Sequence, residues 1–149
     1  MPEYRRAKAY GGLFFFTVVT YNRKPILTQD DVRPLLRQAW IDTKNRLPFT
    51  TEVICLLPDH LHCIWRLPED ETNFSVRWKE IKSFFTKKYL RQVGPREKRN
   101  ESRNQKGEAA IWQRRFWEHL IRDQEDYSRH MDYIHYNPVK HGLVNNVAD

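Results

Sequence analysis

Hydrophobic and polar residues along the chain follow two periods, and the change from one to the other marks the predicted elements. Runs of β-branched and aromatic residues predict strands over 13–20, 51–57 and 60–67, and a weaker alternation predicts a fourth over 111–122. Apolar residues three and four apart predict helices over 28–46, from residue 73 or 75 to Gly94, and over 125–136. The last helix is expected to end before Pro138, because a residue that precedes proline avoids the helical conformation.

The order of these elements predicts the fold. A strand-helix-strand-strand-helix-strand-helix sequence is typical of an α+β domain with a ferredoxin-like, antiparallel sheet. We expect helices on one face of the sheet and the other face free for a site. At 149 residues the chain is expected to form a single domain. The polar segment over 96–110 has no periodicity, so we interpret it as a mobile charged loop.

The composition excludes several classes of protein. Hydrophobic residues make up 40% and charged residues 30% of the chain, as in globular proteins. No apolar run approaches the roughly 18 residues that a membrane span needs, and the basic start of the chain lacks the apolar segment of a signal peptide. Cys55 and Cys63 cannot form a disulfide framework, so we expect a reduced, cytoplasmic setting and no membrane partner.

The positive charge is concentrated in one stretch of the chain. The whole chain carries a net charge of +7, and the stretch from Arg77 to Arg115 holds 13 basic and 4 acidic residues. Aromatic residues are interleaved with this charge. Phosphates attract such charge and bases stack on aromatic rings, so nucleic acid is the favoured partner. A solvated helix face followed by a charged loop is the alternative interpretation.

A His-x-His pair is the first candidate for chemistry. His60 and His62 project from one face of the predicted strand, while Leu61 and Cys63 project from the other. Two imidazoles at this spacing can converge on one metal ion. The pair alone is weak evidence, and histidines that are on the surface or hydrogen-bonded are the alternative.

Tyr133 and Asn137 are the second candidate. They are four residues apart and therefore lie on one face of the predicted helix. A phenol beside an amide that can bind a metal is what a nucleophile near a bound ion requires. For each residue alone the alternative is structural: Tyr133 packs with its hydroxyl towards solvent, and Asn137 caps the helix. We interpret His130, His135 and His141 as surface residues or phosphate contacts.

Several motifs occur together and in order. They are the basic start over 1–6, Gly11-Gly12 before an aromatic strand, LPDHLHCIW over 57–65, FSVRWKEIK over 74–82, WQRRFWEH over 112–119 and DYIHYNPVKHG over 132–142. As a set they resemble the REP-associated tyrosine transposases, a branch of the single-tyrosine HUH transposases, in which HUH denotes His-hydrophobic-His. The resemblance runs over nearly the whole chain.

The resemblance implies roles for individual residues. The HUH histidines, which bind a divalent ion in that family, correspond to His60 and His62, and the polar residue that completes the metal site corresponds to Asn137. The catalytic tyrosine corresponds to Tyr133, on the C-terminal helix. The segment over 1–12 corresponds to the part that helps to read DNA. With the basic stretch, the expected DNA contacts are Tyr4, Arg5, Arg6, Lys8, Arg77, Lys79, Lys82, Lys87, Lys88, Trp112, Arg114, Arg115 and Lys140.

The resemblance also implies an activity. It is a single-strand DNA endonuclease and strand transferase that uses Mg²⁺ or Mn²⁺, acts on REP-type hairpins and passes through a covalent 5′-phosphotyrosine link. Such an enzyme is expected in the cytoplasm with the nucleoid, and a monomer is favoured over a dimer. Two alternatives stay open: a non-catalytic hairpin-binding protein derived from a transposase, and an HUH relaxase or replication initiator.

Overall fold

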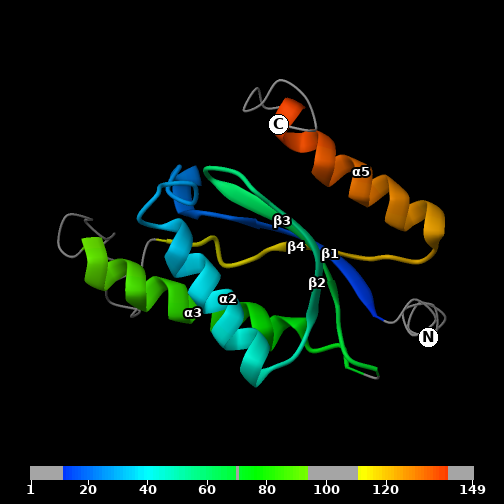
Figure 1. Cartoon of the computed structure of the whole chain (residues 1–149), viewed down its shortest axis with the longest axis horizontal. Helices are drawn as coiled ribbons and strands as arrows, with labels where there is room; N and C mark the ends of the chain where they lie inside the picture. The colour runs from blue at the N-terminus through cyan, green and yellow to red at the C-terminus, as the bar shows by residue number, and fades with distance from the viewer. Residues whose placement is uncertain (1–11, 70, 94–110, 141–149) are drawn as a thin grey trace.

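An antiparallel sheet runs through the middle of the molecule, with helices on both faces (Figure 1). The computed structural model describes residues 12–69, 71–93 and 111–140. In chain order the elements are β1 (Leu13–Val19), the one-turn 3₁₀ helix η1 (Tyr21–Arg23), α2 (Arg33–Arg46), β2 (Thr50–Leu56), β3 (His60–Arg66), α3 (Phe74–Val93), β4 (Trp117–Leu120) and α5 (Gln124–Lys140). The four strands lie in the order β2-β3-β1-β4, which confirms the predicted ferredoxin-like fold.

The strand β1 shows that the sheet packs against other elements on both of its faces. Its side chains alternate between the faces, and nearly all of them are buried. Phe14 and Phe16 pack with α2 and α3, whereas Leu13 and Phe15 pack on the other face, where Ile134 of α5 covers them. The sequence predicts that this second face is free for a site. The structure corrects that prediction, because α5 packs on part of the face. A continuous apolar run is what a strand buried on both faces requires.

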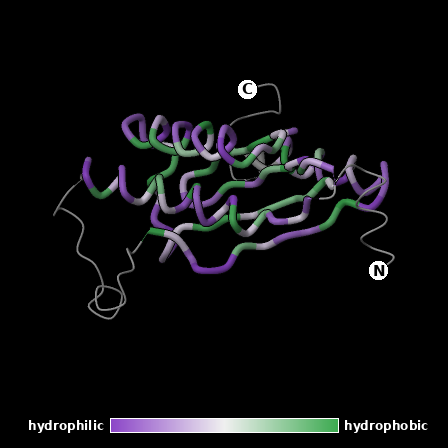
Figure 2. The backbone as a smooth tube through the Cα atoms, turned by 90° about the horizontal axis from the view of Figure 1, so that it is seen from below, coloured by the Kyte–Doolittle hydropathy of each residue, from purple (hydrophilic) through white to green (hydrophobic). Residues whose placement is uncertain are grey.

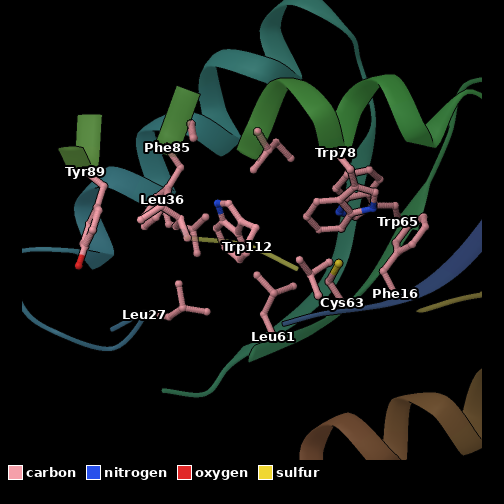
Figure 3. Packing of buried hydrophobic residues seen from close by; sticks show 14 of the residues in the cluster. Phe16, Leu27, Leu36, Leu61, Cys63, Trp65, Trp78, Phe85, Tyr89 and Trp112 are labelled. Atoms are coloured by element: carbon pink, nitrogen blue, oxygen red, sulfur yellow. The ribbon is translucent and has the colours of Figure 1, made fainter. Parts of the chain in front are cut away.

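The larger layer is an aromatic core between the sheet and the helices α2 and α3. The rings of Trp65 and Trp78 stack with their centroids 4.3 Å apart, and Phe16 meets both rings edge-on (Figure 3). Along the helices the chain alternates between hydrophilic and hydrophobic residues, as amphipathic helices do (Figure 2). This layer fixes the sheet from which the site is built.

Three predicted boundaries are corrected by the structure. The first helix begins at Arg33, after a run of turns over 28–32, and Pro34 occupies its first turn. The fourth strand is limited to β4, because Trp112 forms only an isolated bridge with Thr20 and no residue between it and β4 belongs to a strand. The last helix, α5, continues past Pro138 to Lys140. A proline removes one backbone donor from a helix, and so close to the helix end this loss is small.

Two other expectations cannot be compared with the structure. The end of the second helix at Gly94 and the charged loop over 96–110 lie outside the described residues. Among the helices of the described residues, none has both the length and the apolar composition of a membrane span.

Lys82 joins α3 to the segment that precedes β4. Its Nζ donates a hydrogen bond to the carbonyl of Gln113 at 3.0 Å and lies 5.4 Å from the centroid of the Phe116 ring. Burial lowers the pKa of Lys82 to about 8. The folded protein therefore releases this proton at a lower pH than the unfolded chain does.

This pKa predicts a pH dependence of stability. Between about pH 8 and the ordinary lysine value of 10.5, the unfolded chain binds a proton at Lys82 that the folded protein has lost, so this residue makes the free energy of unfolding rise with pH. In urea unfolding, we expect the free energy of unfolding of the parent to increase relative to that of Lys82→Met as the pH rises from 7.5 to 10. Parallel pH profiles for the two proteins would contradict the lowered pKa.

Candidate functional site

The register between β1 and β3 brings His60 and His62 together. Val19 of β1 lies opposite His60, and Thr17 lies opposite His62. Both histidines are buried, and their ring centroids are 4.9 Å apart with the planes nearly perpendicular. The two imidazoles thus share one face of the sheet, as the strand period predicts, and this is the face that carries α5.

Each of these histidines makes a hydrogen bond through its Nδ1 atom. The Nδ1 of His60 lies 2.6 Å from Oδ1 of Asp59, and the Nδ1 of His62 lies 2.7 Å from Oγ1 of Thr17. Partial burial opposes ionisation of Asp59, but its bond to His60 and the charge of Arg23 outweigh burial and lower the pKa of that carboxyl. Asp59 is therefore an ionised acceptor, and His60 carries its proton on Nδ1. The Nε2 atom of His60 is then the one with a lone pair for a metal ion.

Tyr133 of α5 lies over the same part of the sheet. Its ring meets that of His62 edge-on at a centroid distance of 5.2 Å, and it meets Phe15 at 6.2 Å. The neighbouring residue Ile134 is buried against the sheet, whereas Tyr133 is 44% exposed. The helix thus holds a phenol beside the paired imidazoles and leaves one side of it open to solvent.

Asn137 follows Tyr133 by one turn of α5, as predicted from its spacing. The backbone there is helical, and the side chain lies outside the described part of the structure. Its predicted role in a metal site therefore stays a prediction.

A second polar cluster, which the sequence analysis missed, lies on the same face. The carboxylate of Asp126 lies 2.9 Å from Nε2 of His119 and 3.1 Å from Nδ1 of His130, and it accepts the backbone N–H of Arg122. Burial opposes ionisation of Asp126, but the Arg122 bond and the His119 contact prevail and lower its pKa. Asp126 and His130 are four residues apart on a predicted helix, which was a usable signal. The position of His119 opposite Phe15 depends on the β1–β4 register, which the sequence does not reveal.

This second cluster could also hold a divalent ion. Within the described residues it is the one group of three His, Cys, Asp or Glu side chains whose ligand atoms all lie within 4.8 Å of one another. The rings of His119 and His130 are stacked, with centroids 4.4 Å apart and planes 17° apart. An imidazole binds a metal in the plane of its ring, so one ring would have to turn before both could bind the same ion. As it stands, the cluster is a hydrogen-bonded network around Asp126.

Two of the expected DNA contacts are corrected by the structure. Arg77 is 4% exposed, and its guanidinium donates to the carbonyls of Leu47, Pro48 and Asn73. Trp112 is buried in the aromatic core. Both side chains are committed to the interior, so neither is accessible to a nucleic acid.

The other expected contacts lie in several places. Lys79, Lys87 and Lys88 are exposed on α3, and Lys82 is partly buried there; this helix packs on the face of the sheet opposite to His60 and His62. Arg114 and Arg115 are exposed in the segment before β4. The N-terminal candidates Tyr4, Arg5, Arg6 and Lys8, and the side chain of Lys140, lie outside the described residues. The structure thus brings together the histidines and the tyrosine but not the α3 lysines.

The fold and the geometry of these residues define a class of protein. It is a ferredoxin-like α+β protein in which paired histidines on a central strand face a tyrosine on a C-terminal helix. This fold is shared by a solved protein from Deinococcus radiodurans R1 that is provisionally named a transposase. The two match with a TM-score of 0.55 at 14% identity, over 82% of this chain and 87% of that chain.

Comparison with known proteins then gives the family. A REP-associated tyrosine transposase of Escherichia coli K12 is 44% identical over the whole of this chain and 79% of its own length, and a Haemophilus influenzae protein provisionally given the same name is 46% identical over 82% of its length. A solved REP-associated tyrosine transposase bound to a REP hairpin is 43% identical, with a TM-score of 0.73, over 93% of this chain and 73% of its own. No family model matches the chain. The chain belongs to the REP-associated tyrosine transposases.

The burial of Arg77 predicts a structural role for it. Replacing Arg77 with Ala leaves buried carbonyls without a donor, so we expect the free energy of unfolding to fall by about 2–3 kcal/mol. Lys79→Ala, an exposed neighbour on α3, is the control and should change it by no more than about 0.5 kcal/mol. Denaturant unfolding measures both. An Arg77→Ala protein that unfolds like the parent, yet binds a DNA hairpin with a shallower salt dependence, would restore Arg77 to the DNA contacts.

Proposed function

We propose that this chain is a metal-dependent, single-strand DNA endonuclease and strand transferase that acts on REP-type hairpins through Tyr133. The observation that carries the proposal is the contact between Tyr133 and His62, whose ring centroids lie 5.2 Å apart within one chain. A solved relative at 43% identity is bound to a REP hairpin, which supports this class of substrate.

The residues around His60 and His62 fit a divalent ion. Metal-binding histidines commonly bond their second ring nitrogen to a carboxylate or another oxygen, which fixes the ring. His60 and His62 do this with Asp59 and Thr17. These two histidines, with Asn137 one turn beyond Tyr133, are the residues that would hold Mg²⁺ or Mn²⁺. When bound, such an ion polarises the scissile phosphate and offsets the charge that develops on its oxygens.

Tyr133 supplies the nucleophile in this proposal. Its Oη forms a bond to the phosphorus while the bond from phosphorus to the 3′ oxygen breaks. The phenol loses its proton to solvent, and the departing 3′ oxygen takes one up, so the products are a 3′ hydroxyl and a 5′-phosphotyrosine link. Because the link keeps the phosphodiester energy, a later 3′ hydroxyl can reverse the step and join strands. The exposed side of Tyr133 leaves room for the DNA strand.

The charged residues contribute binding rather than chemistry. Arg114, Arg115 and the N-terminal residues Tyr4, Arg5, Arg6 and Lys8 are proposed to contact the hairpin, together with Lys140. The exposed lysines of α3, Lys79, Lys87 and Lys88, lie on the far face of the sheet, so we propose that they contact phosphates of DNA that extends beyond the site, whereas Lys82 is held by the Gln113 carbonyl. Tyr133 and the histidines of the same chain are adjacent, which supports action in cis by a monomer.

Removal of one oxygen tests the nucleophile. We expect Tyr133→Phe to bind a labelled REP-type hairpin as the parent does but to form no denaturation-resistant adduct with it in the presence of Mn²⁺. Tyr136→Phe is the control, because Tyr136 is 60% exposed on the same helix and should keep full adduct formation. A denaturing gel separates the adduct from free DNA. An adduct that persists in Tyr133→Phe and disappears in Tyr136→Phe would move the nucleophile to Tyr136.

A further inference from the structure

The turn that follows β1 has an unusual backbone. Asn22 and Arg23, two consecutive residues of η1, have φ angles of 54° and 51°. Residues other than glycine rarely adopt this left-handed conformation, and arginine does so less readily than asparagine. Strain of this kind persists only where surrounding contacts hold it in place, and it often marks a functional element.

The contacts that hold this turn converge on Asp59. The backbone N–H of Thr20 donates to the carbonyl of Asp59 at 2.9 Å, and the Thr20 hydroxyl lies within hydrogen-bond distance of that carbonyl and of the Lys24 carbonyl, at 3.0 and 2.9 Å. The Nε of Arg23 donates to Oδ2 of its carboxylate at 2.9 Å. The turn therefore fixes Asp59 at two points, one on its main chain and one on its side chain.

The other carboxylate oxygen of Asp59 reaches His60. Neighbouring side chains on a strand point to opposite faces, so an aspartate inside β3 could not make this contact. Asp59 lies just before β3, in the turn of the β2–β3 hairpin, and this position brings its Oδ1 within 2.6 Å of Nδ1 of His60. The strained turn, the carboxylate and the imidazole thus form one chain of contacts from Arg23 to His60.

His60 and His62 differ in how their protons are fixed. A carboxylate can only accept, so it holds the proton of His60 on Nδ1 and leaves the lone pair on Nε2. The hydroxyl of Thr17 can donate or accept, so its bond orients the ring of His62 without selecting a tautomer. Asp59 therefore has an effect on its histidine that Thr17 does not have.

We propose that Asp59, clamped by the left-handed η1 turn, is a positioning residue that presents Nε2 of His60 to the divalent ion. This inference rests on the proposed function, in which His60 and His62 hold that ion. The alternative is that Asp59 and Arg23 only brace the hairpin turn. In that case their loss would change stability but not the tautomer of His60.

Two substitutions of Asp59 separate these roles. Asp59→Ala removes the acceptor, and Asp59→Asn replaces a carboxylate that can only accept with a neutral amide that can also donate. In the metal-free protein, ¹⁵N NMR of the imidazole nitrogens should show a proton on Nδ1 of His60 in the parent, and a loss of that preference in both Asp59→Ala and Asp59→Asn. Titration calorimetry with Mn²⁺ should show an affinity roughly tenfold to a hundredfold lower in Asp59→Ala, with Asp59→Asn between it and the parent.

Asp30 provides a matched control. Its carboxylate is 95% exposed and pairs with Arg33 in the first turn of α2 at 2.6 Å, so Asp30→Ala removes an aspartate–arginine pair that belongs to another element. This variant should match the parent in Mn²⁺ affinity and in the tautomer of His60.

The proposal is overturned if Asp59→Ala keeps the parent tautomer and a Mn²⁺ affinity within twofold of the parent. Should Asp59→Ala fail to fold, the isosteric Asp59→Asn decides, since an unchanged affinity there overturns the proposal as well. Failure of the proposed function gives a different result: the parent would bind Mn²⁺ no better than the His60→Ala/His62→Ala double variant. The tautomer measured without metal would still test Asp59.

Discussion

The antiparallel register between β1 and β3 is the constraint on which the site depends. It sets Thr17 opposite His62 and, on the other face, Phe16 opposite Cys63. A shift of one residue in either strand would send its polar side chains into the aromatic core and its aromatic side chains onto the α5 face. Because both faces are buried, such a shift would bury histidines among tryptophans. The packing of Phe16 and Trp65 therefore also specifies the place of the imidazoles.

The α5 helix converts this face of the sheet into a site. Ile134 anchors the helix in the small apolar cluster that contains Phe15, and Asp126 in the first turn binds His119 of β4. These two attachments set the position of the helix along the sheet. Tyr133, next to the anchor, is thereby directed to His62 while remaining partly exposed. The nucleophile role proposed for Tyr133 needs both properties, since a nucleophile must be held in place and also reach a substrate.

Some features of the site could be predicted because they are local. The period of a strand places His60 and His62 on one face, and the period of a helix places Tyr133 and Asn137 on another, whatever the rest of the chain does. The buried positions of Arg77 and Trp112 were not predictable in this way. Basic and aromatic residues in a charged stretch resemble DNA contacts until the packing of α3 shows that they face the interior.

Other features depend on contacts between distant segments. The cluster of His119, Asp126 and His130 requires the register of β4 and the position of α5 together. The bond from Arg23 to Asp59 requires a left-handed turn, which no glycine announces in the sequence. Sequence patterns report the period of an element, whereas these contacts come from how elements meet.

In the function proposed above, a divalent ion lies between His60 and His62, within reach of Tyr133 of the same chain. Anomalous diffraction from crystals grown with Mn²⁺ locates the ion without reference to activity. We expect an anomalous peak within bonding distance of the Nε2 atoms of both histidines. A peak at His119, Asp126 and His130, with none beside His60, would contradict it.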